Sequence, residues 1–257
     1  MWRYMRDYFP VSLVRTAELS PKKNYVLGYH PHGIMSIGAF CNFCTEATDF
    51  SKVFPSITPY TTTLHGLFRI PIYRDYIMSG GGCSVSRSSL NHLLSKSGTG
   101  NAVVIVVGGA AESMSGRPGE HAVLLKNRKG FIRMAVQHGA DLVPMYSFGE
   151  NDIFDQVIFA PNSWMRWFQL KFQKYVGFAP CLFKGQGLLF TDSWGLVPFA
   201  KPVTTVVGKP IAVTQSSNPS EDEVNGYHAQ YVEAIVSLFN KHKVRCGLTE
   251  STELSIY

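Results

Sequence analysis

The sequence predicts an α/β protein in which helices cover a mostly parallel sheet. Short β-rich runs alternate along the chain with segments that have the apolar spacing of helices, as is typical of parallel strands joined by crossovers. Residues 102–107 form a continuous β-branched run, which indicates a strand covered on both faces. With 257 residues, 45% of them hydrophobic, the chain can form one large core, so we expect a single domain over residues 1–257.

Further strands and helices are predicted on either side of this run. Residues 24–28 and 142–148 have the composition of strands, and a loop is expected over residues 29–33. Apolar periodicity and capping residues predict helices at 34–48, from the cap Ser86 to Gly98, and at 129–138 before Gly139. A capping box of Ser220 and Glu223 predicts the start of a further helix. The apolar residues on one stripe of that helix are Val224, Tyr227, Tyr231, Ile235 and Leu238.

The charge of the chain limits the classes of partner. The formal net charge is +6 and the pI is about 9.0, which suits anionic membrane surfaces, phosphorylated ligands or nucleic acid. The basic residues are scattered and no nucleic-acid motif is present, so no nucleic-acid partner is expected. Aromatic residues reach 13%, and they suit an apolar substrate channel or membrane face as well as an ordinary core.

The cysteines do not form a disulfide framework. There are five of them, an odd number, which favours a reducing compartment. Cys41 and Cys44 have the C-x-x-C spacing, but no second cysteine pair or downstream histidine pair stands at zinc spacing. We therefore interpret them as two buried thiols on one helical face, and no metal site is expected.

Membrane contact is expected at an interface. The N-terminus has no apolar region typical of a signal peptide, and the longest apolar run, residues 102–111, is about half as long as a spanning helix. Residues 163–175 mix aromatic and basic side chains, which fits a helix lying in a membrane interface. A helix that packs its aromatic face on the core would explain the same residues.

The clearest candidate for chemistry is the sequence His30-Pro31-His32-Gly33, which follows a predicted strand. Ligands in open α/β sheets bind at the carboxyl ends of strands. Proline favours extended geometry in the residue before it, and glycine lets the backbone turn close to a ligand. An imidazole, with a pKa of about 6.5, suits a general base. The alternative is a packed loop whose histidines bond backbone carbonyls.

A second candidate follows the apolar run at 102–107. Gly108 and Gly109 end the run, and Glu112 comes shortly after them. A carboxylate beside an imidazole fixes its tautomer and stabilises its charged form. A glutamate that only caps the start of a helix would explain Glu112 without catalysis.

Anion-binding residues are predicted before the helix at 129–138. Arg128 and Lys129 lie at its N-terminus, where backbone donors favour phosphate, although a solvated pair of charges is the alternative. Glu150, just beyond the predicted strand at 142–148, could line the same cleft.

Together these segments resemble the type-2 diacylglycerol acyltransferase family, which also contains monoacylglycerol and wax-alcohol acyltransferases. The resemblance runs from residues 8–10 to the C-terminal helix, and residues 28–43 and 171–181 are most similar to the diacylglycerol acyltransferases within it. The ordered motifs that carry it are Tyr29 to Gly33, residues 107–113, Arg128-Lys129-Gly130-Phe131, Val143-Pro144, Phe148-Gly149-Glu150, and residues 204–210.

The resemblance implies an acyl-CoA-dependent enzyme that makes triacylglycerol from diacylglycerol, with acyl-CoA as co-substrate and no other cofactor. It implies the cytosolic face of the endoplasmic reticulum membrane, with lipid droplets as a second location, and is compatible with an oligomer. Similarity to the glycerolipid acyltransferase superfamily implies an αβα domain, in which His30, His32 and Glu112 match the catalytic positions. The family's N-terminal hydrophobic hairpin is absent from this sequence.

The mechanistic hypothesis assigns one role to each candidate residue. A loop histidine, for which we favour His32 over His30, removes the proton of the acceptor hydroxyl as this attacks the thioester, and no covalent acyl-enzyme is needed. Glu112 orients the imidazole. The further roles are oxyanion binding by backbone N–H groups near Gly108 and Gly109, phosphate binding by Arg128 and Lys129, and contact with the substrate at Gly33 and Glu150.

Two alternatives stay open at this point. The acceptor could be monoacylglycerol or a long-chain alcohol. The chain could also be a catalytically silent lipid-binding protein, as the absent hairpin suggests. No G-x-S-x-G motif is present, which counts against a serine esterase.

Overall fold

The computed structural model, which describes residues 2–178, 180–187 and 194–257, is built on a seven-stranded sheet. Its strands are, in spatial order, β1 (Val11–Arg15), β11 (Val203–Val207), β7 (Asp141–Phe148), β2 (Tyr25–His30), β5 (Asn101–Val106), β3 (Thr58–Thr63) and β4 (Cys83–Ser84). Neighbouring strands are parallel except for β11 and β7, which run antiparallel. The predicted α/β fold with a mostly parallel sheet is confirmed.

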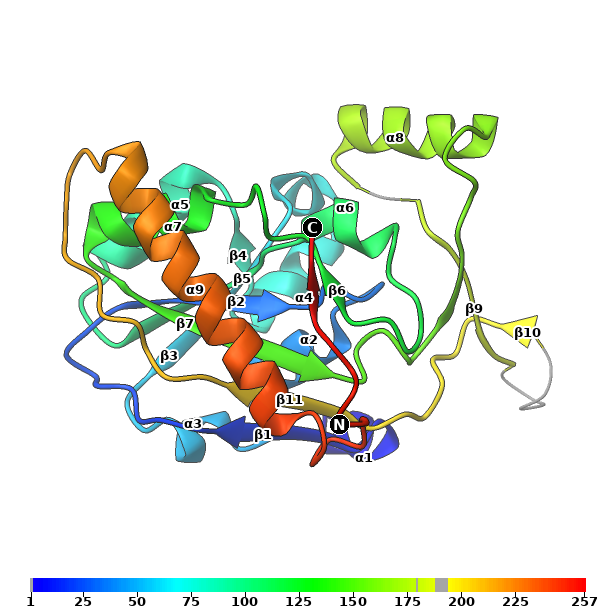
Figure 1. Cartoon of the computed structure of the whole chain (residues 1–257), viewed down its shortest axis with the longest axis horizontal. Helices are drawn as coiled ribbons and strands as arrows, with labels where there is room; N and C mark the ends of the chain where they lie inside the picture. The colour runs from blue at the N-terminus through cyan, green and yellow to red at the C-terminus, as the bar shows by residue number, and fades with distance from the viewer. Residues whose placement is uncertain (1, 179, 188–193) are drawn as a thin grey trace.

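Helices cover both faces of this sheet, and β2 shows why. Val26 packs in a cluster with residues of α5 (Arg87–Ser95), α7 (Gly130–His138) and α9 (Glu221–His242). Its neighbour Leu27 points to the opposite face, where it packs with α2 (Ile37–Phe43) and α3 (Phe50–Val53). Because successive side chains of a strand alternate between faces, β2 is buried on both. Figure 1 shows α9 crossing the front of the sheet.

Smaller elements surround this core. Those with helical structure are α1 (Trp2–Tyr8), η1 (His65–Arg69), α4 (Tyr73–Ser79), α6 (Gly109–Ser113) and α8 (Trp164–Val176). The remaining strands form a three-stranded sheet, β10 (Trp194–Gly195), β9 (Leu182–Gln186) and β8 (Asp155–Val157), and a parallel pair, β12 (Ser255–Ile256) with β6 (Ala122–Val123). Helix α8 projects from the upper right of the molecule in Figure 1.

Local capping signals predicted helix ends well. Both hydrogen bonds of the capping box at the start of α9 are present, and Gly139 ends α7 in the left-handed conformation. Ser86 caps α5, but this helix ends at Ser95, before Gly98. On α9, four members of the predicted stripe are buried and Tyr227 is half-buried.

The predicted helix over residues 34–48 was too long, because α2 covers only Ile37–Phe43. The hydroxyl of Thr45 donates to the carbonyl of Cys41 at 2.6 Å, and such a side-chain bond competes with continuation of the helix. Cys41 is buried within α2, while Cys44 is half-buried directly after it, and both thiols are free.

The predicted strand over residues 24–28 was too short, because β2 continues to His30. Pairing with β7 extends to His30 and Tyr146, so the loop begins at Pro31 and not at Tyr29. The first histidine of the motif therefore belongs to the sheet.

Substitution of Gly28 should show how closely β2 and α9 approach. A Cβ atom at Gly28 would overlap the hydroxyl of Tyr231, so Gly28→Ala should lower the free energy of unfolding by about 2 kcal/mol, as overpacked cores do. Urea unfolding measures the change. Gly226→Ala is the matched control, because a Cβ there meets no atom within 4 Å and alanine favours a helix. Equal loss in both variants would contradict the prediction.

Candidate active site

The candidate residues meet at one edge of the sheet. Strands β2, β5 and β7 are adjacent and parallel, so their carboxyl ends lie together. The loop with His32 follows β2, α6 with Glu112 follows β5, and Glu150 follows β7. The structure therefore brings these three residues, predicted from separate parts of the chain, into one site, while their catalytic roles stay predictions.

His30 is fully buried beneath α9. Its Nε2 lies 3.1 Å from the hydroxyl of Tyr231, which itself donates to the carbonyl of Gly28 at 3.1 Å. Because that hydroxyl proton is used on Gly28, the Nε2 of His30 must be the donor to Tyr231. Burial lowers the pKa of His30 to about 3, so the ring is neutral and fixed in one tautomer. This geometry suits a residue that supports the loop.

His32 is half-buried and differs from His30 in its hydrogen bonding. Its Nδ1 lies 2.9 Å from the carbonyl of Gly33, and since a carbonyl only accepts, Nδ1 carries the proton. The Nε2 lone pair has no hydrogen-bond partner among the described residues. Burial lowers the pKa of His32, which keeps the ring neutral near pH 7. A neutral imidazole with a free Nε2 is the form that a general base requires.

Glu112 is buried and holds the backbone of the site. One carboxylate oxygen accepts the N–H of His32 at 2.5 Å, and the other accepts the N–H of Leu124 at 2.6 Å. We expected Glu112 to orient the imidazole directly, whereas these two bonds fix the main chain that carries it. Burial raises the pKa of Glu112, while both amides and nearby Arg128 oppose the shift.

The glycines after β5 lie against this carboxylate. A Cβ at Gly108 would overlap the carboxyl group of Glu112, so only glycine fits there. Gly109 begins α6 with φ +58. The first N–H groups of a helix have no partner within it, so the start of α6 supplies donors beside Glu112. These are the candidate oxyanion donors.

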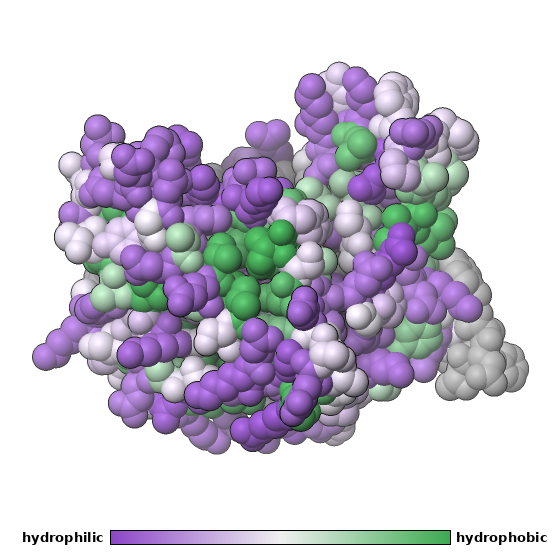
Figure 2. Space-filling model, viewed as in Figure 1, coloured by the Kyte–Doolittle hydropathy of each residue, from purple (hydrophilic) through white to green (hydrophobic). Residues whose placement is uncertain are grey.

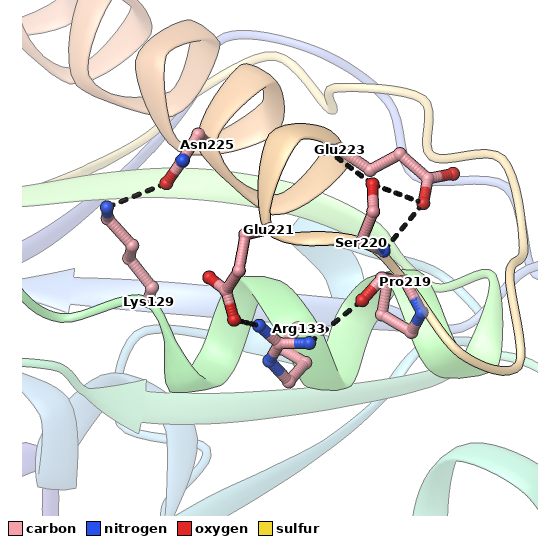
Figure 3. A network of polar contacts seen from close by, with 7 residues as sticks. All are labelled: Lys129, Arg133, Pro219, Ser220, Glu221, Glu223 and Asn225. Atoms are coloured by element: carbon pink, nitrogen blue, oxygen red, sulfur yellow. Dashed lines mark hydrogen bonds and ion pairs between the residues drawn. The ribbon is translucent and has the colours of Figure 1, made fainter.

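Arg128 and Lys129 are adjacent in sequence but point to different places. The guanidinium of Arg128 donates to the carbonyl of Gly108 at 3.2 Å, so it lies at the site. The ammonium of Lys129 donates to Asn225 of α9 at 2.7 Å. Figure 3 shows this contact beside the ion pair of Arg133 with Glu221. Of the two predicted phosphate ligands, only Arg128 contacts the residues around Glu112.

Lys129 instead lines a groove of about 730 Å³ along α9. Val232, Val236 and Ile256 are among its apolar lining residues, and Lys126 lines it together with Lys129. Figure 2 shows this groove as a hydrophobic hollow near the centre of the visible face. Its size is typical of small-molecule pockets.

Glu150 is buried behind the loop, in a polar network that the sequence did not predict. Its carboxylate accepts the hydroxyl of Tyr29 at 2.6 Å and the N–H of Gly38 at 3.0 Å. A Cβ at Gly33 would lie 2.8 Å from the Cγ of Glu150, so the side chain of Glu150 packs against the turn after His32 and leaves space only for glycine there. Burial raises the pKa of Glu150 to about 7. Buried in this way, Glu150 supports the turn from behind.

The network continues away from the loop through neutral side chains. Ser147 donates to Glu150 at 3.3 Å and lies 3.0 Å from the hydroxyl of Thr205, which accepts from Asn42 at 2.9 Å. Tyr29 and Ser147 could have been suspected from polar groups within buried strands. The backbone amide of Leu124 leaves no sequence signal.

Two further features of the described residues bear on ligands and membranes. No group of three or more His, Cys, Asp or Glu in the described ranges could hold a metal ion. Within those ranges, no helix is both long and apolar enough to cross a bilayer.

The chain is similar over its whole length to known acyltransferases. The diacylglycerol acyltransferase family model matches residues 1–257. Human diacylglycerol O-acyltransferase 2 is 59% identical over 256 residues, which cover 100% of this chain and 66% of the relative. The zebrafish (Danio rerio) counterpart is 57% identical over 257 residues, covering 100% and 71%. Human 2-acylglycerol O-acyltransferase 3 is 57% identical, covering 99% and 75%.

A solved structure is also similar. It is the 1-acyl-sn-glycerophosphate acyltransferase PlsC from Thermotoga maritima, with 13% identity and a TM-score of 0.48, covering 92% of this chain and 76% of that one. The present chain spans about 66% of the length of the human and mouse diacylglycerol O-acyltransferases 2.

Replacement of Glu150 by glutamine should change how stability depends on pH. The pKa of Glu150 is about 7 in the folded protein against a usual value of 4.5, so the folded state binds this proton more tightly. The wild type should therefore lose about 3 kcal/mol of stability as the pH rises from about 4.5 to about 7. Glu150→Gln does not titrate there and should lack this loss. Urea unfolding across that range tests it, and parallel pH profiles would contradict it.

Proposed function

This chain belongs to the diacylglycerol acyltransferase family, and we propose that it transfers a fatty acyl group from acyl-CoA to the hydroxyl of diacylglycerol, making triacylglycerol. The observation that carries the proposal is the neutral imidazole of His32, whose Nδ1 bonds the carbonyl of Gly33 and whose Nε2 has no partner among the described residues, on a loop held by Glu112 of α6. Acylation of monoacylglycerol is the second candidate, which the similarity to human 2-acylglycerol O-acyltransferase 3 favours. Acyl-CoA is the co-substrate, and no cofactor is proposed.

The reaction proceeds by direct attack. The Nε2 of His32 takes the proton of the acceptor hydroxyl as its oxygen attacks the thioester carbonyl. The carbonyl π electrons move to the oxygen, which backbone N–H groups at the start of α6, by Gly108 and Gly109, stabilise. The tetrahedral intermediate then collapses, the C–S bond breaks, and the imidazolium returns its proton to the CoA sulfur. The products are the ester and free CoA.

Glu112 serves this reaction in two ways. Its bond to the N–H of His32 fixes the loop, and its negative charge favours the imidazolium that forms during attack. His30 supports the loop from the α9 side through Tyr231. Both are positioning residues, whereas His32 meets the reacting atoms.

The CoA phosphates are assigned to the cations around α7. Arg128 is exposed and held at Gly108, so it can reach an anion while staying beside the site. Lys129 with Lys126 offers a second group of cations, which lines the α9 groove.

We propose a membrane surface as the place where the lipid acceptor is met. Trp164 and Trp167 of α8 are 76% and 62% exposed, and Phe168 is 51% exposed, beside the cation Lys171. Because these three aromatic side chains are exposed, they are not packed on the core. Aromatic and basic residues on one helix suit the interface of an anionic bilayer. The cytosolic face of the endoplasmic reticulum and lipid droplets are the locations that fit this reaction.

Acyl transfer to a panel of acceptors tests the proposed function. Purified protein with radiolabelled acyl-CoA should form labelled triacylglycerol from diacylglycerol, and lipid separation shows which of diacylglycerol, monoacylglycerol and long-chain alcohol is used. Single-turnover rates for His32→Ala should fall at least about a hundredfold, the lower bound for a general base. His30→Ala should slow the reaction less, because His30 acts through the loop.

His92→Ala is the matched control, since His92 is an exposed histidine away from the site. Circular dichroism shows that each variant is folded. The absence of product with every acceptor would support the alternative of a catalytically silent lipid-binding protein. Near-normal rates for His32→Ala would show that His32 is not the general base.

Removal of the exposed aromatic residues of α8 should weaken membrane binding. Changing Trp164, Trp167 and Phe168 to Ser removes apolar area that would enter the interface, so co-sedimentation with phosphatidylserine-containing vesicles should fall at least about tenfold in partition coefficient. Val244→Ser is the control, because Val244 is an exposed apolar residue (53%) that lies outside α8. Wild-type protein that stays wholly in the supernatant would refute the interfacial role.

A further inference from the structure

The segment at residues 121–126 connects the end of the chain to the candidate active site. On one side it pairs in parallel with β12 and the Tyr257 that follows, through Ser255 N–H to His121 O at 2.8 Å and Tyr257 N–H to Val123 O at 3.1 Å. The carbonyl of Tyr257 then accepts two amides, Leu125 N–H at 3.1 Å and Lys126 N–H at 3.0 Å.

The other side of this segment faces Glu112. Backbone groups of an extended chain alternate in direction. The carbonyl of Val123 and the N–H of Leu125 therefore face Tyr257, whereas the N–H of Leu124 faces the opposite side. The Leu124 amide donates to Glu112, whose other oxygen accepts the amide of His32. A continuous series of hydrogen bonds therefore runs from Tyr257 through the segment and Glu112 to the catalytic loop.

We propose that residues 255–257 are a positioning element of the acyltransferase site, holding the Leu124 amide against Glu112 and so the His32 loop in its reactive geometry. This inference rests on the proposed function. Side-chain packing of β12 is slight, because Ser255 and Tyr257 are exposed and only Ile256 is half-buried. Four backbone bonds join residues 255–257 to the segment, one from Ser255 and three from Tyr257.

A pH profile separates positioning from simple stability. The groups that act on Glu112 are Arg128 before α7, Tyr146 of β7, Tyr257 and the amide of His32. Losing the Leu124 donor would raise the pKa of Glu112, because that amide opposes the effect of burial. A loosened loop would also admit water to His32, whose pKa burial now lowers. Both changes move the acidic limb of kcat to higher pH.

The test is Tyr257→Pro, which removes the N–H that bonds Val123. We expect kcat to fall about tenfold, the effect of one charge-assisted hydrogen bond, with the KM for acyl-CoA within about twofold. The acidic limb should move to higher pH, and its position does not depend on how much of the protein is folded. Hydrogen exchange of residues 121–126 should become faster.

Glu253→Pro is the matched control, because Glu253 is exposed, precedes β12, and its N–H makes no hydrogen bond among the described residues. It should leave kcat, the pH profile and exchange unchanged. Faster exchange in Tyr257→Pro with an unmoved acidic limb and normal kcat would overturn the proposal. An inactive wild type would instead overturn the proposed function, so the two failures are distinguishable.

Discussion

The buried carboxylate of Glu112 is the constraint on which the site depends. A buried charge is costly unless hydrogen bonds replace its water, and here the N–H groups of His32 and Leu124 do so. Meeting this requirement forces three separate segments together: the loop after β2, helix α6 and residues 121–126. It also leaves no space for a side chain at Gly108, which explains the glycine directly before α6.

The two faces of β2 complete this arrangement. His30 points toward α9 and bonds Tyr231, whereas Tyr29 points toward α2 and bonds Glu150. The end of the strand is therefore fixed from both sides before the chain turns at Gly33. His32 lies just beyond these anchors and is half-buried. Burial lowers the pKa of both histidines, but the Nε2 of His30 bonds Tyr231, whereas the Nε2 of His32 has no partner among the described residues.

Local sequence signals carried much of the fold but only part of the site. Ser220 with Glu223 and the left-handed Gly139 act within a few residues, so their helix ends could be predicted. The bond of His30 to Tyr231 spans 201 positions, and the Leu124 amide belongs to a backbone that any residue would supply. Such contacts are set by tertiary packing. The separation of Arg128 from Lys129 was missed for the same reason.

The site is organised for geometry at some cost in stability. One oxygen of Glu150 and the carbonyl oxygen of Asn42 are buried without a hydrogen-bond partner in the described structure, and unsatisfied groups of this kind lower the free energy of unfolding. Apolar side chains of similar size in place of Glu150 and Asn42 would lower the free energy of unfolding less. An apolar side chain at position 150 could not, however, accept the N–H of Gly38 and the hydroxyl of Tyr29 beside Gly33, as the carboxylate of Glu150 does. The polar network thus favours one loop conformation, and the proposed acyl transfer by His32 requires that the loop keep this conformation.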